Sequence, residues 1–294
     1  MTAAAQWLQG ARPRTLPAAV APVLVGTGAA ALVSSFRPGR ALLALVVAVA
    51  LQVAVNYAND YSDGVRGTDA HRVGPLRLVG SGVATPAAVK AAALVSFSVA
   101  AVAGLVLALL TTLWLLPLGA VMIAAAWGYT GGASPYGYRG FGEVSVFVFF
   151  GLVAVLGTTY VQAERLTVAA LLGGVACGAL ACAILVVNNL RDVPTDTAAG
   201  KRTLAVVLGE RRTRLLYSGL VLLAFAVAVG LVAVTPWSLL ALLAAPLALG
   251  PLRRVRSGAT GRDLVPVLGG TGQLQLAYAV LLAAGLALSV VLPG

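Results

Sequence analysis

Asn56-Tyr-Ala-Asn-Asp60-Tyr-Ser-Asp63-Gly-Val-Arg66-Gly-Thr-Asp69 is the stretch that decides the fold, because it places three carboxylates directly after a long apolar run. A second stretch, Asn188-Asn189-Leu-Arg191-Asp192-Val-Pro-Thr-Asp196, ends another apolar run and leads into the basic pair Lys201-Arg202. In both motifs an asparagine precedes an aspartate by four residues, and a further aspartate follows. Residues at this spacing share one face of a helix that continues through the motif.

Outside these motifs the chain is strongly apolar. Of its 294 residues 60% are hydrophobic and only 10% are charged, and the mean hydropathy is +0.96. This composition lies far outside the range of soluble globular domains, so we predict an all-α, polytopic membrane protein. Arg12 and Arg14 lead into an apolar segment without a distinct cleavage region, so the first segment is expected to stay as a helix. Cys177 and Cys182 share one apolar run, which predicts packing rather than a disulfide or a metal.

Apolar runs of about 20 residues, the length that crosses a bilayer, recur through the sequence. We predict one transmembrane domain over residues 1–294 with nine spans, which are 16–35, 41–58, 86–110, 114–130, 141–161, 166–189, 213–234, 237–252 and 273–292. With the N-terminus in the cytoplasm, 17 of the 20 basic residues fall on the cytoplasmic side, as the positive-inside rule requires. The net charge of +11 is therefore assigned to membrane topology and not to nucleic acid, and we expect a multi-pass protein of the cell membrane.

The two acidic motifs, within 56–69 and 188–202, close the second and sixth predicted spans. An even number of crossings separates them, so both are expected at the cytoplasmic face, where a duplicated four-helix unit is a plausible origin. Pro194 disfavours helical geometry at Val193, so the second helix is expected to bend or end there.

Carboxylate and amide oxygens are hard ligands that suit Mg²⁺, and clustered carboxylates at a membrane boundary need a cation. His71 is the only histidine and is expected to be a loop residue. Basic side chains beside such a metal indicate a phosphorylated ligand, and the candidates are Arg66, Arg72, Arg77, Arg191, Lys201 and Arg202. At the mouth of an apolar bundle, that ligand is expected to be a prenyl diphosphate or a phospholipid precursor.

The pattern Asn56-x-x-x-Asp60-x-x-Asp63 with Asn188-x-x-x-Asp192-x-x-x-Asp196 resembles the paired aspartate-rich motifs of the UbiA superfamily of intramembrane prenyltransferases. Arg12-Pro-Arg14-Thr-Leu-Pro and Ala199-Gly200-Lys201-Arg202-Thr203-Leu204 are similar to the branch that prenylates 1,4-dihydroxy-2-naphthoate. The last acid of the first motif stands one residue early, with Gly64 in the usual place. Either Asp63 or Asp69 is therefore expected to complete the first metal site.

The resemblance implies Mg²⁺-dependent transfer of a polyprenyl group from polyprenyl diphosphate to 1,4-dihydroxy-2-naphthoate. Loss of CO₂ and diphosphate would give demethylmenaquinone, a step of menaquinone biosynthesis. The expected metal ligands are Asp60, Asp63, Asp69, Asp192 and Asp196. The residues expected to bind substrate are Asn56, Arg66, Asn188, Lys201, Arg202, Arg14, Tyr136 and Tyr138. Arg12 and Arg14 either bind the acceptor carboxylate or anchor the helix end.

Three rival functions can be compared with these motifs. Another aromatic acceptor, such as 4-hydroxybenzoate, homogentisate or a haem vinyl group, would use the same donor site. A CDP-alcohol phosphotransferase needs an Asp-Gly-x-x-Ala-Arg start, which Asp63-Gly64-Val-Arg66 does not supply. A cation-coupled transporter would hold acids near the bilayer midplane, whereas here they cluster at one face.

Overall fold

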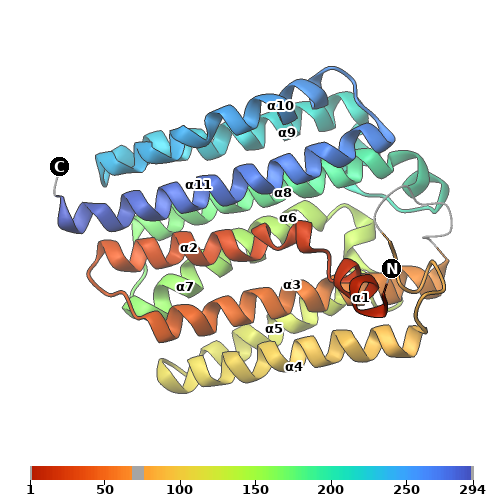
Figure 1. Cartoon of the computed structure of the whole chain (residues 1–294), viewed down its shortest axis with the longest axis horizontal. Helices are drawn as coiled ribbons and strands as arrows, with labels where there is room; N and C mark the ends of the chain where they lie inside the picture. The colour runs from red at the N-terminus through yellow and green to blue at the C-terminus, as the bar shows by residue number, and fades with distance from the viewer. Residues whose placement is uncertain (1, 68–75, 293–294) are drawn as a thin grey trace.

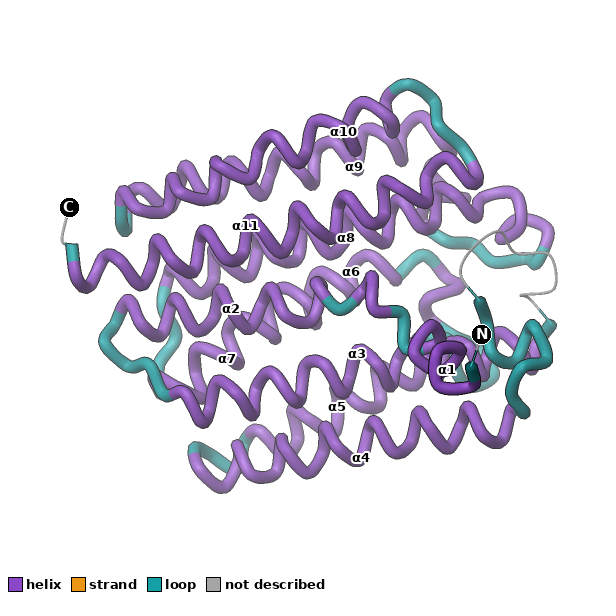
Figure 2. Tube along the Cα trace, in the orientation of Figure 1, coloured by secondary structure: helices purple, strands orange, loops and turns teal. Residues whose placement is uncertain are grey.

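The computed structural model describes residues 2–67 and 76–292, and within them the chain is a bundle of helices without a strand (Figures 1 and 2). The α-helices are α1 Ala3–Gly10, α2 Pro17–Leu32, α3 Pro38–Arg66, α4 Pro86–Leu110, α5 Leu115–Gly128, α6 Gly142–Val146, α7 Ala154–Ala163, α8 Val168–Ala198, α9 Leu204–Gly230, α10 Ala245–Arg256 and α11 Val265–Val291. Short 3-10 turns occur at η1 Pro13–Thr15, η2 Tyr136–Arg139, η4 Leu231–Ala233, η5 Pro236–Ala244 and η6 Gly261–Leu264, and a π-helical segment at η3 Phe147–Val153.

The described residues contain seven helices that are long and apolar enough to cross a membrane. An eighth crossing results if Ala3–Thr15 and Pro17–Leu32, which are bent by 50°, form one broken span. The predicted span 114–130 forms the shorter apolar helix α5. The prediction of an all-α, multi-pass membrane bundle is therefore confirmed, and the predicted number of nine spans is approximate.

Two helices run further than the apolar pattern predicted. α3 continues to Arg66 and α8 to Ala198, so each carries its acidic motif on helical backbone. The helix was expected to bend or to end at Pro194. The prediction that it ends there is wrong, because α8 continues past Pro194 to Ala198. Proline removes one backbone donor, yet the helix continues, and two threonines bond back to its last turns: Thr195 to the carbonyl of Asp192 at 2.9 Å and Thr197 to that of Val193 at 2.7 Å. We name the end of the bundle that carries both motifs the motif face; it lies at the right of Figure 1.

The bundle has two packed groups of helices. α9 and α10 lie at one edge of Figure 1 and α4 at the other. The larger apolar core joins α8, α9 and α11 with part of α2, and its biggest fully buried side chains include Tyr217 and Tyr278. A separate core joins α3 and α4 with residues 76–79, around Tyr57 and Phe97. A third, smaller cluster of Val23, Ala44, Leu107 and Val161 connects α2, α3, α4 and α7 between these two cores.

The π-helical segment η3 packs closely against α8. A Cβ added to Gly151 would lie 2.5 Å from the Cα of Gly178 and 2.6 Å from the carbonyl oxygen of Gly174, so only glycine fits this crossing. π-helical turns are rare and occur often at functional sites. Here the segment carries Phe149 and Phe150, which line the cavity described next.

Candidate active site

A cavity of about 1090 Å³ runs from the motif face into the bundle. Helices α2, α3, α4, α5, α7, α8 and α11 all contribute to its wall. Along α3 the lining runs from Asp63 back to Ala44, which is roughly 28 Å of helix at 1.5 Å per residue. Its charged residues gather at the motif face, and the deeper wall is mostly apolar, with Thr158 as a polar residue on α7.

Asp63 is the best-connected carboxylate of this cavity and is 4% exposed. The hydroxyl of Tyr138 donates to its Oδ1. The ammonium of Lys201 donates to the same oxygen at 3.2 Å. The guanidinium of Arg77 donates to its Oδ2 at 3.4 Å. Lys201 also stands 4.4 Å from the centre of the Tyr138 ring. The first motif therefore meets residues from three distant parts of the chain.

The second motif contributes Asn188, Asn189, Asp192 and Asp196 to the same cavity. The guanidinium of Arg191 donates to both oxygens of Asp192, at 2.7 and 2.6 Å, and to Oδ1 of Asn188 at 2.9 Å. The amide of Asn189 donates to the buried carboxylate of Glu143 at 2.9 Å. These bonds fix the direction of the polar side chains on α8.

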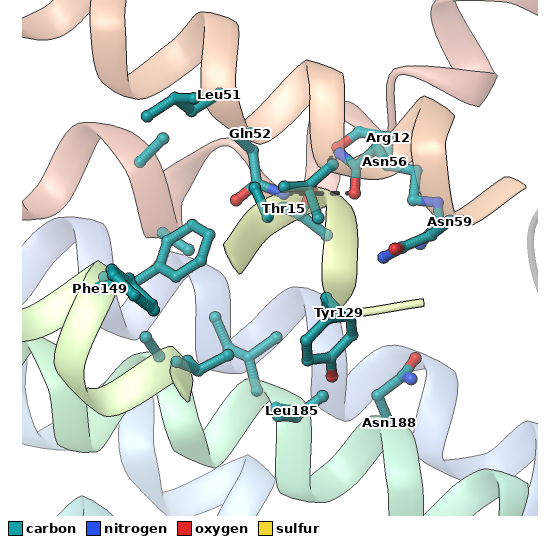
Figure 3. A pocket seen from close by; sticks show the side chains of 18 of the residues that line it. Arg12, Thr15, Leu51, Gln52, Asn56, Asn59, Tyr129, Phe149, Leu185 and Asn188 are labelled. Atoms are coloured by element: carbon teal, nitrogen blue, oxygen red, sulfur yellow. Dashed lines mark hydrogen bonds between the residues drawn. The ribbon is translucent and has the colours of Figure 1, made fainter. Parts of the chain in front are cut away.

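A network of neutral polar groups ties α3 to the segment between α1 and α2. Gln52 donates to Thr15 Oγ1 and to Asn56 Oδ1, each at 3.2 Å, and Asn56 donates to the carbonyl of Ala11 at 2.8 Å. Figure 3 shows Arg12 beside Asn56, with Tyr129 and Asn188 across the cavity from them. Arg12 has a left-handed backbone (φ 54°), a conformation that few non-glycine residues adopt.

Burial raises the pKa of Tyr136, while a hydrogen bond with Ser145 opposes this shift. The hydroxyl of Tyr136 donates to the carbonyl of Ala125 at 2.8 Å. Tyr136 therefore lines the cavity as a neutral phenol and not as a base.

Most of the residues predicted for the site line this one cavity. They are Asp63, Asp192, Asp196, Asn56, Asn188, Lys201, Arg14, Tyr136 and Tyr138.

Three predicted residues do not line the cavity, although the guanidinium of Arg66 lies 5.6 Å from the centre of the Tyr138 ring. Asp60 is fully buried, and its carboxylate accepts the backbone amides of Leu78 at 2.8 Å and Val79 at 3.0 Å. Arg66 donates to the carbonyls of Thr130 and Gly132, which fixes the turn after α5.

The third, Arg202, is exposed, and its backbone amide donates to the carbonyl of Tyr138 at 2.9 Å. Asp69, together with His71 and Arg72, falls outside the described residues. The metal-ligand roles of Asp60 and Asp69 stay predictions.

Asn59 is a cavity residue that the sequence reasoning missed. It lines the cavity and accepts a hydrogen bond of 2.7 Å from the hydroxyl of Thr130. The signal was present, because Asn56, Asn59 and Asp63 follow one another at spacings of three and four, the spacing of one helical face. Arg77 was among the candidate basic residues, but its contact with Asp63 joins positions 14 residues apart and could not be predicted from helical spacing.

No three described His, Cys, Asp or Glu side chains gather into a ready-made metal site. The donor chemistry nevertheless fits Mg²⁺, which takes one or two carboxylates and fills its other positions with water and substrate phosphates. Asp63, Asp192 and Asp196 offer carboxylate oxygens on one cavity, and Asn59 and Asn188 offer amide oxygens.

A helical membrane bundle that holds carboxylates and cations at one end of an apolar cavity has the distribution of charge that suits an amphiphilic phosphorylated lipid. Residues 19–265 match the UbiA prenyltransferase family, and the chain belongs to this family. The 1,4-dihydroxy-2-naphthoate octaprenyltransferase of Mycobacterium tuberculosis (strain ATCC 25618 / H37Rv) is 58% identical over 287 residues, which cover 98% of each chain.

Solved structures share the fold. The apo structure of a UbiA homolog from Aeropyrum pernix K1 gives a TM-score of 0.70 at 16% identity and covers 93% of this chain and 98% of its own. A UbiA homolog from Archaeoglobus fulgidus bound to GPP and Mg²⁺ gives 0.67 at 14% identity, with 95% and 99% covered. At these identities the likeness extends to the architecture of the bundle.

Proposed function

We propose that this protein transfers a polyprenyl chain from polyprenyl diphosphate to 1,4-dihydroxy-2-naphthoate in menaquinone biosynthesis. One observation carries the proposal: Asp63, Asp192 and Asp196 lie with Arg77 and Lys201 at one end of a cavity whose other end is apolar. This distribution suits a lipid with a diphosphate head and a hydrocarbon tail. The relative at 58% identity, which is named as an octaprenyltransferase for this acceptor, supports the choice of substrates.

The diphosphate would bind at the motif face. Lys201 and Arg77, which both contact Asp63, would donate to the oxygens of the diphosphate. Arg191, beside Asp192, would do the same. Asp63, Asp192 and Asp196 would hold Mg²⁺, the ion that the solved structure of the Archaeoglobus fulgidus homolog contains. Bound Mg²⁺ would neutralise charge on the diphosphate and so assist its departure.

The acceptor would bind against the wall formed by Arg12, Thr15, Gln52 and Asn56, which faces Tyr129 across the cavity (Figure 3). Amide and hydroxyl groups there suit the phenolic hydroxyls of a naphthoate, and Arg12 or Arg14 suits its carboxylate. Both arginines line the cavity.

In the reaction, the bond between C1 of the prenyl chain and the diphosphate oxygen breaks, and the electron pair leaves on the diphosphate. The ring carbon that bears the carboxylate supplies the electron pair of the new carbon–carbon bond. Departure of the carboxylate as CO₂ returns an electron pair to the ring, so the product is the quinol form of demethylmenaquinone. The apolar and aromatic lining, including Tyr129 and Phe149, would keep the allylic cation from water.

We further propose that the chain is one prenyltransferase domain in the cell membrane, with its N-terminus and its motif face in the cytoplasm. The distribution of basic residues supports this orientation.

The test is transfer of a labelled prenyl group by the purified protein in lipid nanodiscs, with product identified by mass spectrometry. We expect demethylmenaquinol with 1,4-dihydroxy-2-naphthoate and much less product with 4-hydroxybenzoate or homogentisate. Mg²⁺ chelation, Asp63→Ala and Asp192→Ala should each abolish transfer. Glu210→Ala is the matched control. Glu210 is an exposed acidic residue near the start of α9, and it pairs with Arg214 outside the cavity. Wild-type turnover in Asp63→Ala and Asp192→Ala would refute the site, and faster turnover of another acceptor would refute the assignment of the acceptor.

A further inference from the structure

A group of exposed arginines lies on the motif face outside the cavity, near the start of α9 and at the end of α10. These two helices form one edge of the bundle (Figure 1). Both belong to segments long and apolar enough to cross a membrane, so the arginines lie where these segments leave the hydrocarbon. We name the group the arginine patch; its members are Arg211, Arg212, Arg253, Arg254 and Arg256.

One side chain holds the two parts of the arginine patch together. The guanidinium of Arg214 donates to the carbonyl of Val255 at 2.7 Å and pairs with the carboxylate of Glu210 at 3.0 Å. Val255 is the residue between Arg254 and Arg256. The arginines of α9 therefore lie beside those of α10.

The protein does not balance the charge of the arginine patch. Glu210 is the only acidic residue on α9 and α10, and it already pairs with Arg214. Within the described residues, no hydrogen bond or ion pair engages a guanidinium of the patch. The cations at the cavity differ, because Lys201, Arg77 and Arg191 each contact a carboxylate. The patch is therefore available to an anion from outside the chain.

Helix geometry and membrane topology each explain only part of the patch. The last turn of a helix favours cations, which suits the three arginines at the end of α10. Arg211 and Arg212 stand in the first turn after the break at Gly209, where a helix dipole disfavours cations. The positive-inside rule explains basic residues on a cytoplasmic face, but not their gathering on two neighbouring helices.

Exposed leucines continue from the patch along the same helix faces. Leu215 follows Arg211 by four residues, and Leu249 precedes Arg253 by four, so each pair shares one face of its helix. Leu215 is 61% exposed and Leu249 is 53% exposed. Cations above an exposed apolar surface complement a lipid, whose anionic headgroup lies above its acyl chains. A soluble polyanion such as nucleic acid would make no use of the leucines.

We propose that the arginine patch binds the headgroup of an anionic phospholipid of the surrounding membrane, with its acyl chains against the exposed leucines. Clusters of basic residues at the cytoplasmic ends of membrane helices attract such lipids. Guanidinium groups suit the phosphate because they donate two parallel hydrogen bonds to its oxygens. The site lies outside the cavity, so the inference does not depend on the prenyl transfer proposed above.

The test measures lipid binding by native mass spectrometry of the purified protein in a neutral detergent. The two ligands are phosphatidylglycerol, which is anionic, and phosphatidylcholine, which has the same acyl chains and no net charge. We expect the wild type to bind phosphatidylglycerol more tightly. Arg211→Gln/Arg212→Gln and Arg253→Gln/Arg254→Gln should each weaken this binding roughly 25-fold, at about fivefold per arginine, and should leave the binding of phosphatidylcholine unchanged.

The matched control is Lys90→Gln/Arg139→Gln, which removes the same charge from two exposed residues elsewhere on the motif face. Lys90 lies near the start of α4, at the edge of the bundle opposite α9 and α10 (Figure 1). This variant should bind phosphatidylglycerol within about twofold of the wild type, the range of an exposed charge. Arg214 stays intact in every variant because it joins the two helices, and melting temperatures show that each variant is folded.

Equal affinity of the wild type for the two lipids, or unchanged binding in both patch variants, would overturn the inference. An equal loss in the control variant would also overturn it, because that result reports the charge of the whole face. Glycerol 3-phosphate, a soluble phosphate ester, should not displace the lipid at equal concentration; displacement would identify a site for free phosphate instead. The test reads no transfer activity, so its result leaves the proposed function untouched.

Discussion

Lys201 and Arg202 are adjacent in sequence and carry the same charge, but the structure gives them different surroundings. The ammonium of Lys201 lies 3.2 Å from Asp63 Oδ1, and the lysine side chain is only 12% exposed. Arg202 is exposed and does not line the cavity. We therefore predict that Lys201→Met severely impairs prenyl transfer and that Arg202→Met does not.

The size of the effect follows from the contact. A hydrogen bond to a charged group contributes about 1.5–3 kcal/mol, and each 1.36 kcal/mol is a factor of ten in rate, so Lys201→Met should lower kcat/KM for the donor roughly 10- to 100-fold. Because Lys201 is largely shielded from water, salt should screen the loss only weakly. Arg202→Met should stay within about twofold of the wild type, the range of an exposed charge.

The assay is the initial rate of transfer in nanodiscs, at saturating acceptor and varied donor, with melting temperatures recorded for both variants. If Arg202→Met loses as much kcat/KM as Lys201→Met, the argument from cavity lining is wrong. If Lys201→Met keeps wild-type kcat/KM, Lys201 does not bind the donor. Lys201→Arg, which keeps the charge, should recover part of the activity.

Three other substitutions test separate contacts. Asp60→Asn removes a charged acceptor from two backbone amides, so the melting temperature should fall by the equivalent of about 1.5–3 kcal/mol, and an unchanged value would contradict this supporting role. Glu143→Leu should leave the amide of Asn189 unpaired and destabilise the fold by about 1–3 kcal/mol in thermal melts, whereas Glu143→Gln retains an acceptor and should melt near the wild type. Hydrogen bonds from Arg40 and then Arg37 lower the pKa of Glu164, so its stabilising effect is present above its unfolded pKa and is lost as the pH falls through the lower folded value. Glu164→Gln should flatten the acidic end of a plot of melting temperature against pH, and an identical plot would show that this exposed pair contributes nothing.

The sequence predicted the helical membrane architecture because hydrophobic span length is a local property. A run such as 86–110 must cross the bilayer with its backbone groups bonded internally, and α4 has these bounds. The polar ends were harder to predict. The apolar runs stop near 58 and 189, but the helices continue to Arg66 and Ala198, since asparagine, aspartate and arginine remain compatible with helical backbone where the chain leaves the hydrocarbon.

In the site, too, contacts along one helix were predictable from the sequence and contacts between distant segments were not. Spacing along one helix predicted that Asn56 and Asp63 act together, and both line the cavity. It could not predict that Asp60, one turn from each, turns its carboxylate to the backbone of residues 78–79, because that contact joins segments 18 residues apart.

The two acidic motifs, 56–69 and 188–202, together predicted the class of protein, and the even number of spans between them predicted that they share one end of the bundle. Only the tertiary structure decided which neighbouring charges enter the cavity, because Lys201 and Arg202 differ in their contacts and not in their local sequence. It also decided that Leu107 of α4 and Val161 of α7 belong to one buried cluster, since both helices pack against α3.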